Sequence, residues 1–295
     1  MPELPEVESI RIQLQRFLVG HEIKEVVINY SKTLKEEDKK NIIGANIKKV
    51  RRFGKALVID LSNSYSIVAH VKMTGQFIYR GPNLKNPRPL SKKVVGGLPG
   101  LPAEVLLSRT KAGKHTHVIF TLDRGGVLYF NDYRKFGWMR LVKSKELTDD
   151  SFIGKLGKEF LKDLNENEFS EILLRSKKPI KLLLMDQGKM AGVGNIYAND
   201  ALWLAGINPR KKSLSLSLSL RKKLFESIES VLKQGIKRGG ASELAFVTPD
   251  GGEGKYQDFT LVYGREGEPC KVCKTPIKKI KLGGRGTYFC PACQS

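Results

Sequence analysis

The amino-acid sequence predicts an α+β protein of two domains. We expect an N-terminal β-sandwich with a helix before it, and a C-terminal helical module that ends in a β-hairpin zinc ribbon. The chain has 295 residues, enough for two domains of roughly 150 residues each. Strand-like apolar runs fill its first half, helical spacing fills its second half, and all four cysteines lie in the last 26 residues.

The first expected element is a helix over residues 5–19, because Ile10, Leu14, Phe17 and Leu18 recur at helical spacing and Gly20 ends the pattern. Short apolar runs separated by turn residues follow, a pattern typical of a β-sandwich or barrel. These runs predict strands at residues 23–28, 47–50, 56–61, 66–71, 76–79, 117–122, 127–130 and 138–141.

Residues 81–114 interrupt the strand pattern. They contain five prolines, seven Lys or Arg residues and one glutamate. A connection of this length is long for a compact domain, so we interpret it as a basic insertion. A solvated loop without function is the favoured interpretation.

Beyond residue 150 the spacing predicts helices at 168–174, 180–187 and 197–205. Residues 213–220 alternate Ser and Leu, which by period alone predicts a strand. We interpret only their end as the start of a helix, because apolar residues continue at steps of three and four to Ile236 before Gly239 and Gly240 stop it. The polar stretch 143–151 predicts a boundary between a domain of residues 1–145 and one of 150–240.

Charge points to the class of partner. The 52 Lys and Arg residues against 30 Asp and Glu leave a net charge of +22, and such a field attracts polyanions, whose released counterions drive binding. Nucleic acid is favoured over an anionic membrane surface or a merely solvated basic surface. No apolar run reaches the ~18 residues of a membrane helix, and the acidic, proline-rich N-terminus is unlike a signal peptide. We therefore expect a cytosolic protein without a membrane partner.

The cysteines form two Cys-x-x-Cys pairs, a spacing typical of a structural zinc ribbon. The expected ligands of one Zn²⁺ are Cys270, Cys273, Cys290 and Cys293. Residues 276–281 and 285–289 predict the hairpin between the pairs, joined across Gly283 and Gly284. Disulfides or accidental pairs are the alternatives.

The N-terminus offers an unusual chemical group. Removal of Met1 would leave Pro2 as a secondary amine, and an α-amine has a reference pKa of only ~7.7–8.0. Such an amine can attack a sugar C1′ to form an iminium, with Glu3 and Glu6 nearby to move protons or stabilise positive charge. The alternative is that these residues merely begin a helix, and position alone favours it.

The sequence resembles the bacterial formamidopyrimidine-DNA glycosylase family along most of its length. The matching segments are 1–8 (MPELPEVE), 51–61 (RRFGKALVIDL), 70–75 (HVKMTG), 114–118 (KHTHV), 131–137 (NDYRKFG), 184–202, 262–270 (VYGREGEPC) and 283–293. The resemblance implies a bifunctional base-excision enzyme, a DNA glycosylase and AP lyase for oxidised purines such as 8-oxoguanine and formamidopyrimidine. It also implies a helix-two-turns-helix module within 150–240, a lesion-capping loop and connection at 241–261, and a zinc ribbon at 262–295.

The same resemblance implies catalytic roles. Pro2 would form the Schiff base, Glu3 would be the acid/base, and Glu6 a supporting carboxylate. Lys55 would transfer protons in β-elimination, and Arg285 would act in δ-elimination and contact phosphate. From the residues alone, Lys55 and Arg285 are two cations among 52.

The resemblance implies DNA contacts as well, with a damaged or abasic duplex as partner and a monomer as the enzyme. Met73, Arg134 and Phe136 match a set that fills the space left by a flipped base, although core packing is the alternative for the two apolar members. The other expected contacts are His115, Lys177, Lys178, Lys181 and Asn195; the last lies in the glycine turn at 192–195, which can approach a phosphate.

Three residues depart from the family pattern: Lys158 replaces a proline, Asp200 a glutamate and Lys135 an arginine. Two other functions remain open. One is an endonuclease VIII-like glycosylase for oxidised pyrimidines, and the other is a zinc-ribbon protein that binds DNA without catalysis. If the chain is a member of the glycosylase family, we expect it in the bacterial cytosol or nucleoid.

Overall fold

The computed structural model describes residues 1–84, 113–243 and 245–295, so residues 85–112 of the expected basic insertion lie outside the described residues. The described chain forms two compact units. Unit 1 consists of Met1–Gly154 and Arg238–Gln257, and unit 2 of Lys155–Lys237 and Asp258–Ser295. Unit 1 therefore contains a segment that follows the helices of unit 2 in the sequence.

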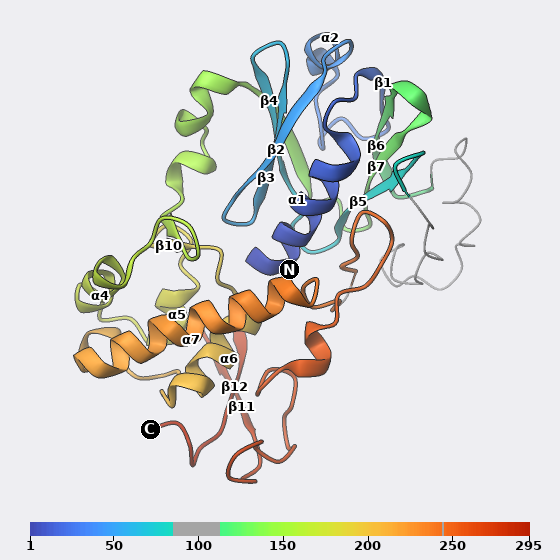
Figure 1. The fold of residues 1–295 in the computed structure, drawn as a ribbon. Coiled ribbons are helices and arrows are strands. Elements are labelled where there is room, and N and C mark those ends of the chain that lie inside the picture. The colour runs from blue at the N-terminus through green and yellow to red at the C-terminus, as the bar shows by residue number, and fades with distance from the viewer. Residues whose placement is uncertain (85–112, 244) are drawn as a thin grey trace. The chain divides into compact units, whose positions relative to one another are not determined.

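Unit 1 is an antiparallel β-sandwich preceded by a helix, α1 (Leu4–Leu18), as the sequence predicts (Figure 1). One sheet has the order β1 (Ile23–Ile28), β6 (Thr116–Leu122), β7 (Val127–Asp132) and β5 (Gly75–Arg80). The other has the order β2 (Ile47–Phe53), β3 (Ala56–Leu61), β4 (Tyr65–His70) and β8 (Trp138–Lys143). A short helix, α2 (Lys39–Ile42), follows the 3₁₀ turn η1 (Glu36–Asp38) between β1 and β2.

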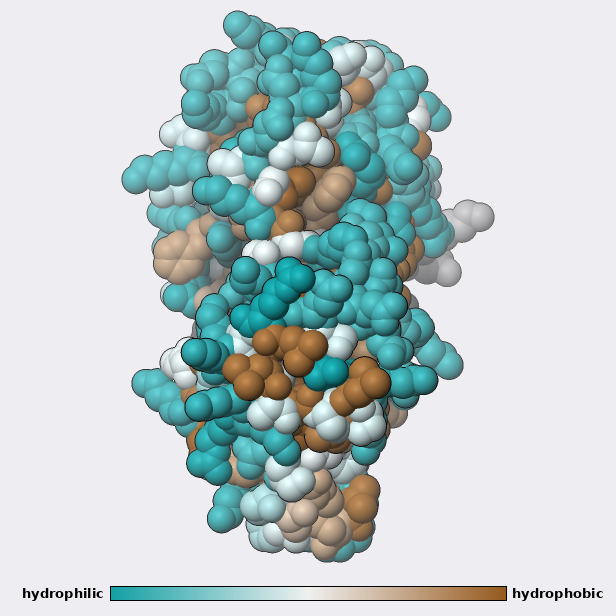
Figure 2. Space-filling view, turned by 90° about the vertical axis from the view of Figure 1, so that its left-hand side faces the viewer, coloured by the Kyte–Doolittle hydropathy of each residue, from teal (hydrophilic) through white to brown (hydrophobic). Residues whose placement is uncertain are grey.

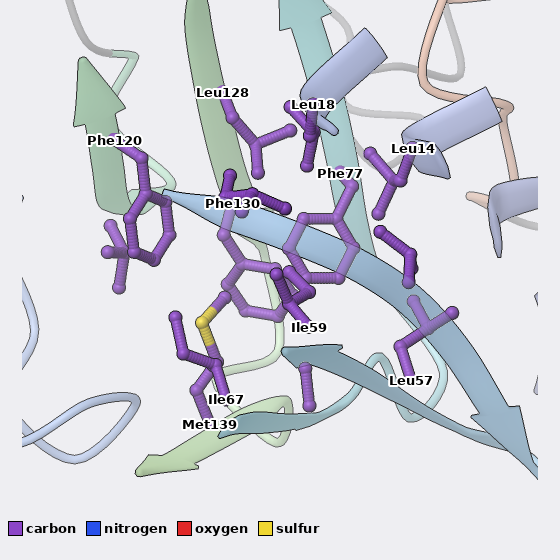
Figure 3. Packing of buried hydrophobic residues seen from close by; sticks show 14 of the residues in the cluster. Leu14, Leu18, Leu57, Ile59, Ile67, Phe77, Phe120, Leu128, Phe130 and Met139 are labelled. Carbon is purple, nitrogen blue, oxygen red and sulfur yellow. The ribbon is translucent and has the colours of Figure 1, made fainter. Parts of the chain in front are cut away.

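The core of unit 1 lies between the two sheets and under α1. In Figure 3, side chains of both sheets and of α1 point toward one another. Phe77 and Phe130 meet at the centre with their ring centroids 5.0 Å apart, and Phe17 of α1 stacks on Tyr79 at 4.7 Å. Burial of these side chains is the main favourable term that holds the sandwich together.

Polar contacts tie α1 to the second sheet. The side-chain oxygen of Gln15 accepts the backbone N–H of Val50 at 2.8 Å. Glu8 of α1 pairs with Arg52 of β2 at 2.8 Å and with Arg11 at 2.8 Å. Burial acts to raise the pKa of Glu8, but hydrogen bonds from the two arginines hold it below its ordinary value. The carboxylate is therefore charged at neutral pH and keeps the helix aligned on the sheet.

Unit 2 contains four helices, two short parallel strands and an antiparallel hairpin among its described residues (Figure 1). The helices are α4 (Glu166–Leu174), α5 (Ile180–Leu184), α6 (Asn195–Ala205) and α7 (Leu218–Lys237). The strands are β9 (Lys158–Glu159), β10 (Met190–Ala191), β11 (Lys278–Leu282) and β12 (Arg285–Phe289). The remaining 3₁₀ turns of the described chain are η3 (Asp123–Gly125), η4 (Ser144–Asp149), η5 (Ile153–Lys155), η6 (Ser213–Ser215) and η7 (Tyr256–Phe259).

Helices α4 and α6 begin two residues before their predicted starts, and helix α5 is shorter than predicted. Helix α5 ends at Leu184 rather than at residue 187, because Asp186 turns the chain: its carbonyl accepts the N–H of Lys189 at 2.9 Å and its carboxylate that of Gly188 at 3.3 Å. The Ser-Leu alternation is a 3₁₀ turn, η6, followed by α7 from Leu218. The alternating segment therefore forms no strand, as expected.

Helix α7 is the longest helix of the described chain and is amphipathic. Leu224, Ile228, Val231 and Leu232 are buried on one face, while lysines and glutamates lie along the rest. A helix of this kind is stabilised by packing one apolar face against its own unit. No helix among the described residues is both long and apolar enough to cross a membrane.

The central ring of the sandwich gives a stability prediction. Phe77→Ala removes a fully buried ring and should lower the free energy of unfolding by ~3–5 kcal/mol, the usual range for such a cavity. Chemical denaturation followed by circular dichroism measures this change. Phe136→Ala deletes the same atoms at a site that is 55% exposed and should change stability by less than ~0.5 kcal/mol. Equal losses in the two variants would contradict the position of the core.

Candidate active site and nucleic-acid interface

Pro2, Glu3 and Glu6 lie together at the beginning of α1, and all three are buried. Glu3 is 3% exposed and Glu6 1%. One oxygen of Glu6 accepts the backbone N–H of Glu3 at 2.7 Å, and the other accepts the backbone N–H of Ala241 at 2.7 Å. A single carboxylate thus fixes the backbone next to Pro2 and joins it to the returning segment of unit 1.

Gly240 is required by this arrangement. Its φ of +82° is unfavourable for other residues, and a Cβ built there would lie 2.7 Å from Cγ of Glu6. The glycine pair predicted to end the preceding helix therefore also lets the backbone approach Glu6. This second role is not visible in the sequence.

Lys55 lies in the turn between β2 and β3 and is buried. Arg52 donates a hydrogen bond to the carbonyl of Gly54 at 3.0 Å while pairing with Glu8. The turn that carries Lys55 is therefore tied to α1, whose first turn follows Glu3.

His70 lies at the same end of this sheet, since Leu57 pairs with Ala69 in the adjacent strands. Burial and the charges of Lys72 and Lys55 lower the pKa of His70 to about 3. The imidazole is therefore neutral at physiological pH, and its Nδ1 accepts the backbone N–H of Lys72 at 2.9 Å. This contact supports the loop that leads to Met73.

The structure brings Met73, Arg134 and Phe136 together on the surface of unit 1. The Nη1 atom of Arg134 lies 3.2 Å from the sulfur of Met73, and its Cζ lies 5.0 Å from the ring centroid of Phe136. Phe136 is 55% exposed, so it does not belong to the core. The cluster combines an apolar side chain, a planar cation and an aromatic ring at one site.

Asp132 organises the loop that carries Arg134 and Phe136, and the sequence motifs did not assign it a role. Its fully buried carboxylate accepts the hydroxyl of Thr74 and the backbone N–H groups of Arg134, at 3.1 Å, and Gly137, at 2.6 Å. The sequence did contain a signal for this role. An acidic residue directly precedes a loop with exposed aromatic side chains, and such residues often form hydrogen bonds with the backbone that follows them.

His115 and Lys135 lie beside this loop. The rings of His115 and Tyr133 are nearly perpendicular, with their centroids 5.2 Å apart. Burial, followed by the charges of Lys114 and Lys135, lowers the pKa of His115, so the imidazole is neutral at pH 7. Lys135 has a φ of +59° and places its ammonium 5.2 Å from the ring centroid of Tyr30. Lys135, which departs from the family pattern, therefore makes a side-chain contact with another loop.

In unit 2, Asn195 begins α6 directly after the glycine turn. Gln187 braces that turn, since its side chain accepts the N–H of Gly192 at 3.0 Å and donates to the carbonyl of Val193 at 2.8 Å. The Asn195 carbonyl accepts a hydrogen bond from the side chain of Asn199 at 2.6 Å. The turn is therefore held firmly at the start of a helix, a position that suits a phosphate.

The expectation that Lys177, Lys178 and Lys181 all reach phosphates is wrong for Lys181. Lys177 and Lys178 are exposed, and Lys178 pairs with Asp186 at 2.8 Å. Lys181 is instead fully buried, and its ammonium donates to the carbonyl of Gly286 at 2.9 Å and to the hydroxyl of Thr287 at 2.6 Å. Because it lies on the inner face of α5, Lys181 braces the hairpin and does not reach a phosphate.

Arg285 begins β12, directly after the turn at Gly283 and Gly284, and is exposed. Asp200, a departure from the family pattern, is fully buried and accepts the backbone N–H groups of residues 261, 262 and 263 at 3.0, 3.0 and 3.1 Å. The shorter side chain of aspartate therefore still makes a full set of contacts. Lys158, another departure, pairs with Glu168 near the start of α4.

The four cysteines converge at the base of the hairpin. Their sulfurs all lie within 4.8 Å of one another, with 3.3 Å between Cys273 and Cys293 and 3.9 Å between Cys270 and Cys293. Four thiolates around one zinc at a Zn–S distance of ~2.3 Å lie ~3.8 Å apart. The cluster fits one structural Zn²⁺, because four protein ligands leave no position open for water.

Three family models match the chain. The formamidopyrimidine-DNA glycosylase N-terminal domain matches residues 1–139, the formamidopyrimidine-DNA glycosylase H2TH domain matches 156–246, and the zinc finger found in FPG and IleRS matches 267–295. The matches follow one another along the chain in the order predicted from the motifs.

Similar proteins cover the full length of the chain. A formamidopyrimidine-DNA glycosylase of Pelotomaculum thermopropionicum is 38% identical over 100% of this chain and 99% of the relative. One of Listeria innocua is 36% identical over 100% of both. Among solved structures, a complex of wild-type Lactococcus lactis Fpg (MutM) with DNA that contains an oxidised pyrimidine has a TM-score of 0.83, 34% identity and full coverage of both chains. A complex of MutM with DNA that contains carbocyclic 8-oxo-G has a TM-score of 0.83 and 33% identity, again with full coverage.

The buried carboxylate of Asp132 gives a testable prediction. Asp132→Asn places an NH₂ group opposite a backbone or hydroxyl donor, so at least one buried donor loses its acceptor. We expect a loss of ~1–3 kcal/mol in stability and weaker binding of an abasic-analogue duplex, measured by thermal denaturation and fluorescence anisotropy. Asp149→Asn, at an exposed position, is the control. Unchanged stability and binding in Asp132→Asn would refute its role in the loop.

The metal site gives a second prediction. Elemental analysis of the purified protein should find one zinc per chain. Cys290→Ser should abolish stoichiometric zinc and unfold the ribbon, because folding of such sites depends on the metal. Val272→Ser, at an exposed position between two ligands, should retain zinc. A Cys290→Ser protein that still holds one zinc would contradict the four-cysteine site.

Proposed function

The chain belongs to the formamidopyrimidine-DNA glycosylase family, and from this premise we propose that it excises oxidised purines from DNA and then cuts the strand by β,δ-elimination. The members of this family are DNA glycosylases with a zinc finger, so DNA glycosylase activity follows from membership. The lyase step, the preferred lesion and the residue roles are our proposal. Its main support is the buried start of α1, where Glu6 holds the backbone beside Pro2.

The first steps use the amine of Pro2 once Met1 has been removed. The nitrogen lone pair forms a bond to C1′ of the damaged nucleotide, and the base leaves with the electrons of the glycosidic bond. Glu3 assists this departure, and the base gains the proton that the Pro2 nitrogen loses. Glu3 donates a proton to the ring oxygen O4′ as its bond to C1′ breaks, which leaves a cationic iminium between Pro2 and the open sugar.

The next steps break the strand. Removal of a proton from C2′ sends electrons into the iminium and expels the 3′ phosphate. A second proton loss, from C4′, expels the 5′ phosphate, and water then hydrolyses the iminium, which releases the sugar remnant and regenerates the Pro2 amine. We assign proton transfer in the first elimination to Lys55, and the phosphate contact in the second to Arg285, whose guanidinium suits anionic oxygens.

In the proposal, one set of residues fills the space that the flipped nucleotide leaves in the DNA duplex, and another set binds the DNA backbone. Met73, Arg134 and Phe136 fill the space left by the flipped nucleotide, because their cluster is exposed and offers both apolar and cationic groups. The backbone contacts are His115, Lys177, Lys178 and Asn195, without Lys181. We assign residues 241–261, of which residue 244 lies outside the described residues, to the lesion-capping loop and connection. In the sequence this segment follows the domains proposed at 1–145 and 150–240 and precedes the ribbon at 262–295.

The partner in this proposal is double-stranded DNA with damaged bases or abasic sites, bound by a monomer in the bacterial cytoplasm where the chromosome lies. A narrower alternative concerns the lesion. One of the similar Lactococcus lactis Fpg structures is a complex with DNA that contains an oxidised pyrimidine, so an endonuclease VIII-like preference is a second candidate. Duplexes that carry 8-oxoguanine, formamidopyrimidine, an oxidised pyrimidine or an abasic site, compared at equal enzyme concentration, distinguish the two.

The proposed nucleophile predicts the outcome of covalent trapping. Borohydride should trap the protein on a damaged duplex, and an uncleaved N-terminal tag should abolish trapping because it turns the Pro2 nitrogen into an amide. Pro2→Gly should retain weak lyase activity through its primary amine. Undiminished trapping in the tagged protein would overturn the role of Pro2, and a complete lack of trapping in the untagged protein would favour binding without catalysis.

The proposed acid predicts a separation of two activities. Glu3→Gln keeps the size of the side chain but removes the titratable carboxyl group. Base excision should fall by ~100-fold or more, the usual scale for a general acid/base, while lesion binding survives. Strand cutting at a pre-formed abasic site should fall less, because it needs no glycosidic cleavage. Single-turnover assays on the two substrates measure the difference, and wild-type excision in Glu3→Gln would assign proton transfer to another group.

A further inference from the structure

Unit 2 carries an apolar surface patch that the proposed chemistry does not use. Figure 2 shows brown apolar side chains gathered on the face turned to the viewer and surrounded by hydrophilic ones. Three neighbouring elements of unit 2 carry exposed leucines: Leu174 at the end of α4, Leu214 in η6 and Leu218 at the start of α7. They are 49%, 39% and 67% exposed, and together we name them the leucine patch.

The local backbone explains why these leucines face outward. Ser213 and Leu216, three positions apart, are the buried residues of the segment. The Ser213 N–H and hydroxyl both donate to the carbonyl of Lys178, at 3.0 and 2.9 Å, and the Leu214 N–H donates to the carbonyl of Ser176 at 3.2 Å. A turn that buries every third residue cannot bury leucines placed at every second position. The Ser-Leu alternation therefore leaves leucines outside.

The leucine patch is not needed for the core of unit 2. The buried face of α7 is formed by Leu224, Ile228, Val231 and Leu232, farther along the helix. Single exposed leucines are ordinary, but neighbouring ones from three elements in a strongly charged chain mark a surface for interaction.

The charge around the leucine patch restricts what binds there. Residues 174–178 contain three Lys or Arg residues and residues 208–223 contain six, and neither segment contains Asp or Glu. Lys212 and Lys222, which the proposed function does not assign to DNA, are exposed, so they stand at the surface beside the leucines. A complementary partner carries carboxylates around a few apolar side chains. We propose that the leucine patch docks an acidic, amphipathic peptide segment of a partner protein.

Other occupants fit less well. A DNA backbone offers phosphates but no apolar surface for the leucines. A bilayer surface is bound by a long amphipathic helix with a free apolar face, whereas the apolar face of α7 is buried in unit 2. A second copy of this chain carries the same net charge of +22 and presents the same cations, so two patches repel each other.

The test uses the full-length zinc-bound protein and a fluorescein-labelled peptide of sequence EELFEDLLEE, whose apolar residues share one helical face. Fluorescence anisotropy should show binding of this peptide but not of KKLFKKLLKK or EESSEDSSEE. The double variant Leu174→Ser/Leu218→Ser should weaken binding by at least ~10-fold, the effect of removing central contacts. Leu204→Ser, at a position on α6 that is 40% exposed and outside the leucine patch, should bind like wild type. Circular dichroism, and the single variant Leu218→Ser if the double variant misfolds, separate docking from folding.

Several outcomes would overturn the proposal. These are absence of binding by the acidic peptide and equal binding by the double variant. Leucine-dependent binding to phosphatidylglycerol vesicles without peptide binding would assign the surface to lipid, and leucine-dependent dimers in sedimentation would assign it to a second copy. Cleavage of abasic DNA should be the same in all variants, so failure of this proposal is distinct from failure of the proposed function.

Discussion

The bridge made by the Glu6 carboxylate is the contact on which the proposed active site depends. It accepts one N–H from Glu3 and one from Ala241, and both the carboxylate and its partners are shielded from water. A buried polar group is costly unless it is hydrogen-bonded, so loss of either contact would destabilise unit 1. The beginning of the chain is thereby locked to a segment that arrives after all the helices of unit 2, and unit 1 is completed only when that segment returns.

The same device recurs where the protein must hold an irregular backbone. Asp132 holds the loop of Arg134 and Phe136, Asp200 holds residues 261–263, and Lys181 holds the start of β12. In each case a buried charged side chain is satisfied mainly by backbone or hydroxyl groups of a loop or strand end. Regular elements satisfy their own backbone groups, but the loops held by Asp132 and Asp200 do not. Arg134, Phe136 and Arg285, three of the exposed residues proposed to meet DNA, are thus carried on segments that buried charges hold in place.

The sandwich strands, α1 and the four-cysteine cluster were predictable because each depends on a local pattern or a fixed spacing of residues. The ends of elements were less so. Helix α5 stops where Asp186 forms hydrogen bonds with the following turn. The Ser-Leu alternation, which has a period of two residues, forms a 3₁₀ turn, which has a period of three. Both outcomes depend on hydrogen bonds with residues outside the periodic run. Among the candidate site residues, motifs proposed Pro2, Glu3, Met73 and Arg134, but Asp132 passed unnoticed because its partners are mainly backbone atoms.

The sequence by itself therefore determined the strand pattern, the charge, the metal ligands and the motifs of the family, since these depend on residue type and spacing alone. Only the tertiary structure decided which charged residues face solvent and which are buried. Lys177 and Lys181 have the same side chain and lie on one short segment, yet one is exposed and the other is enclosed by the hairpin. The physical reason is that burial of a charge depends on acceptors brought from distant parts of the chain, and their arrival is a property of the fold rather than of the local sequence.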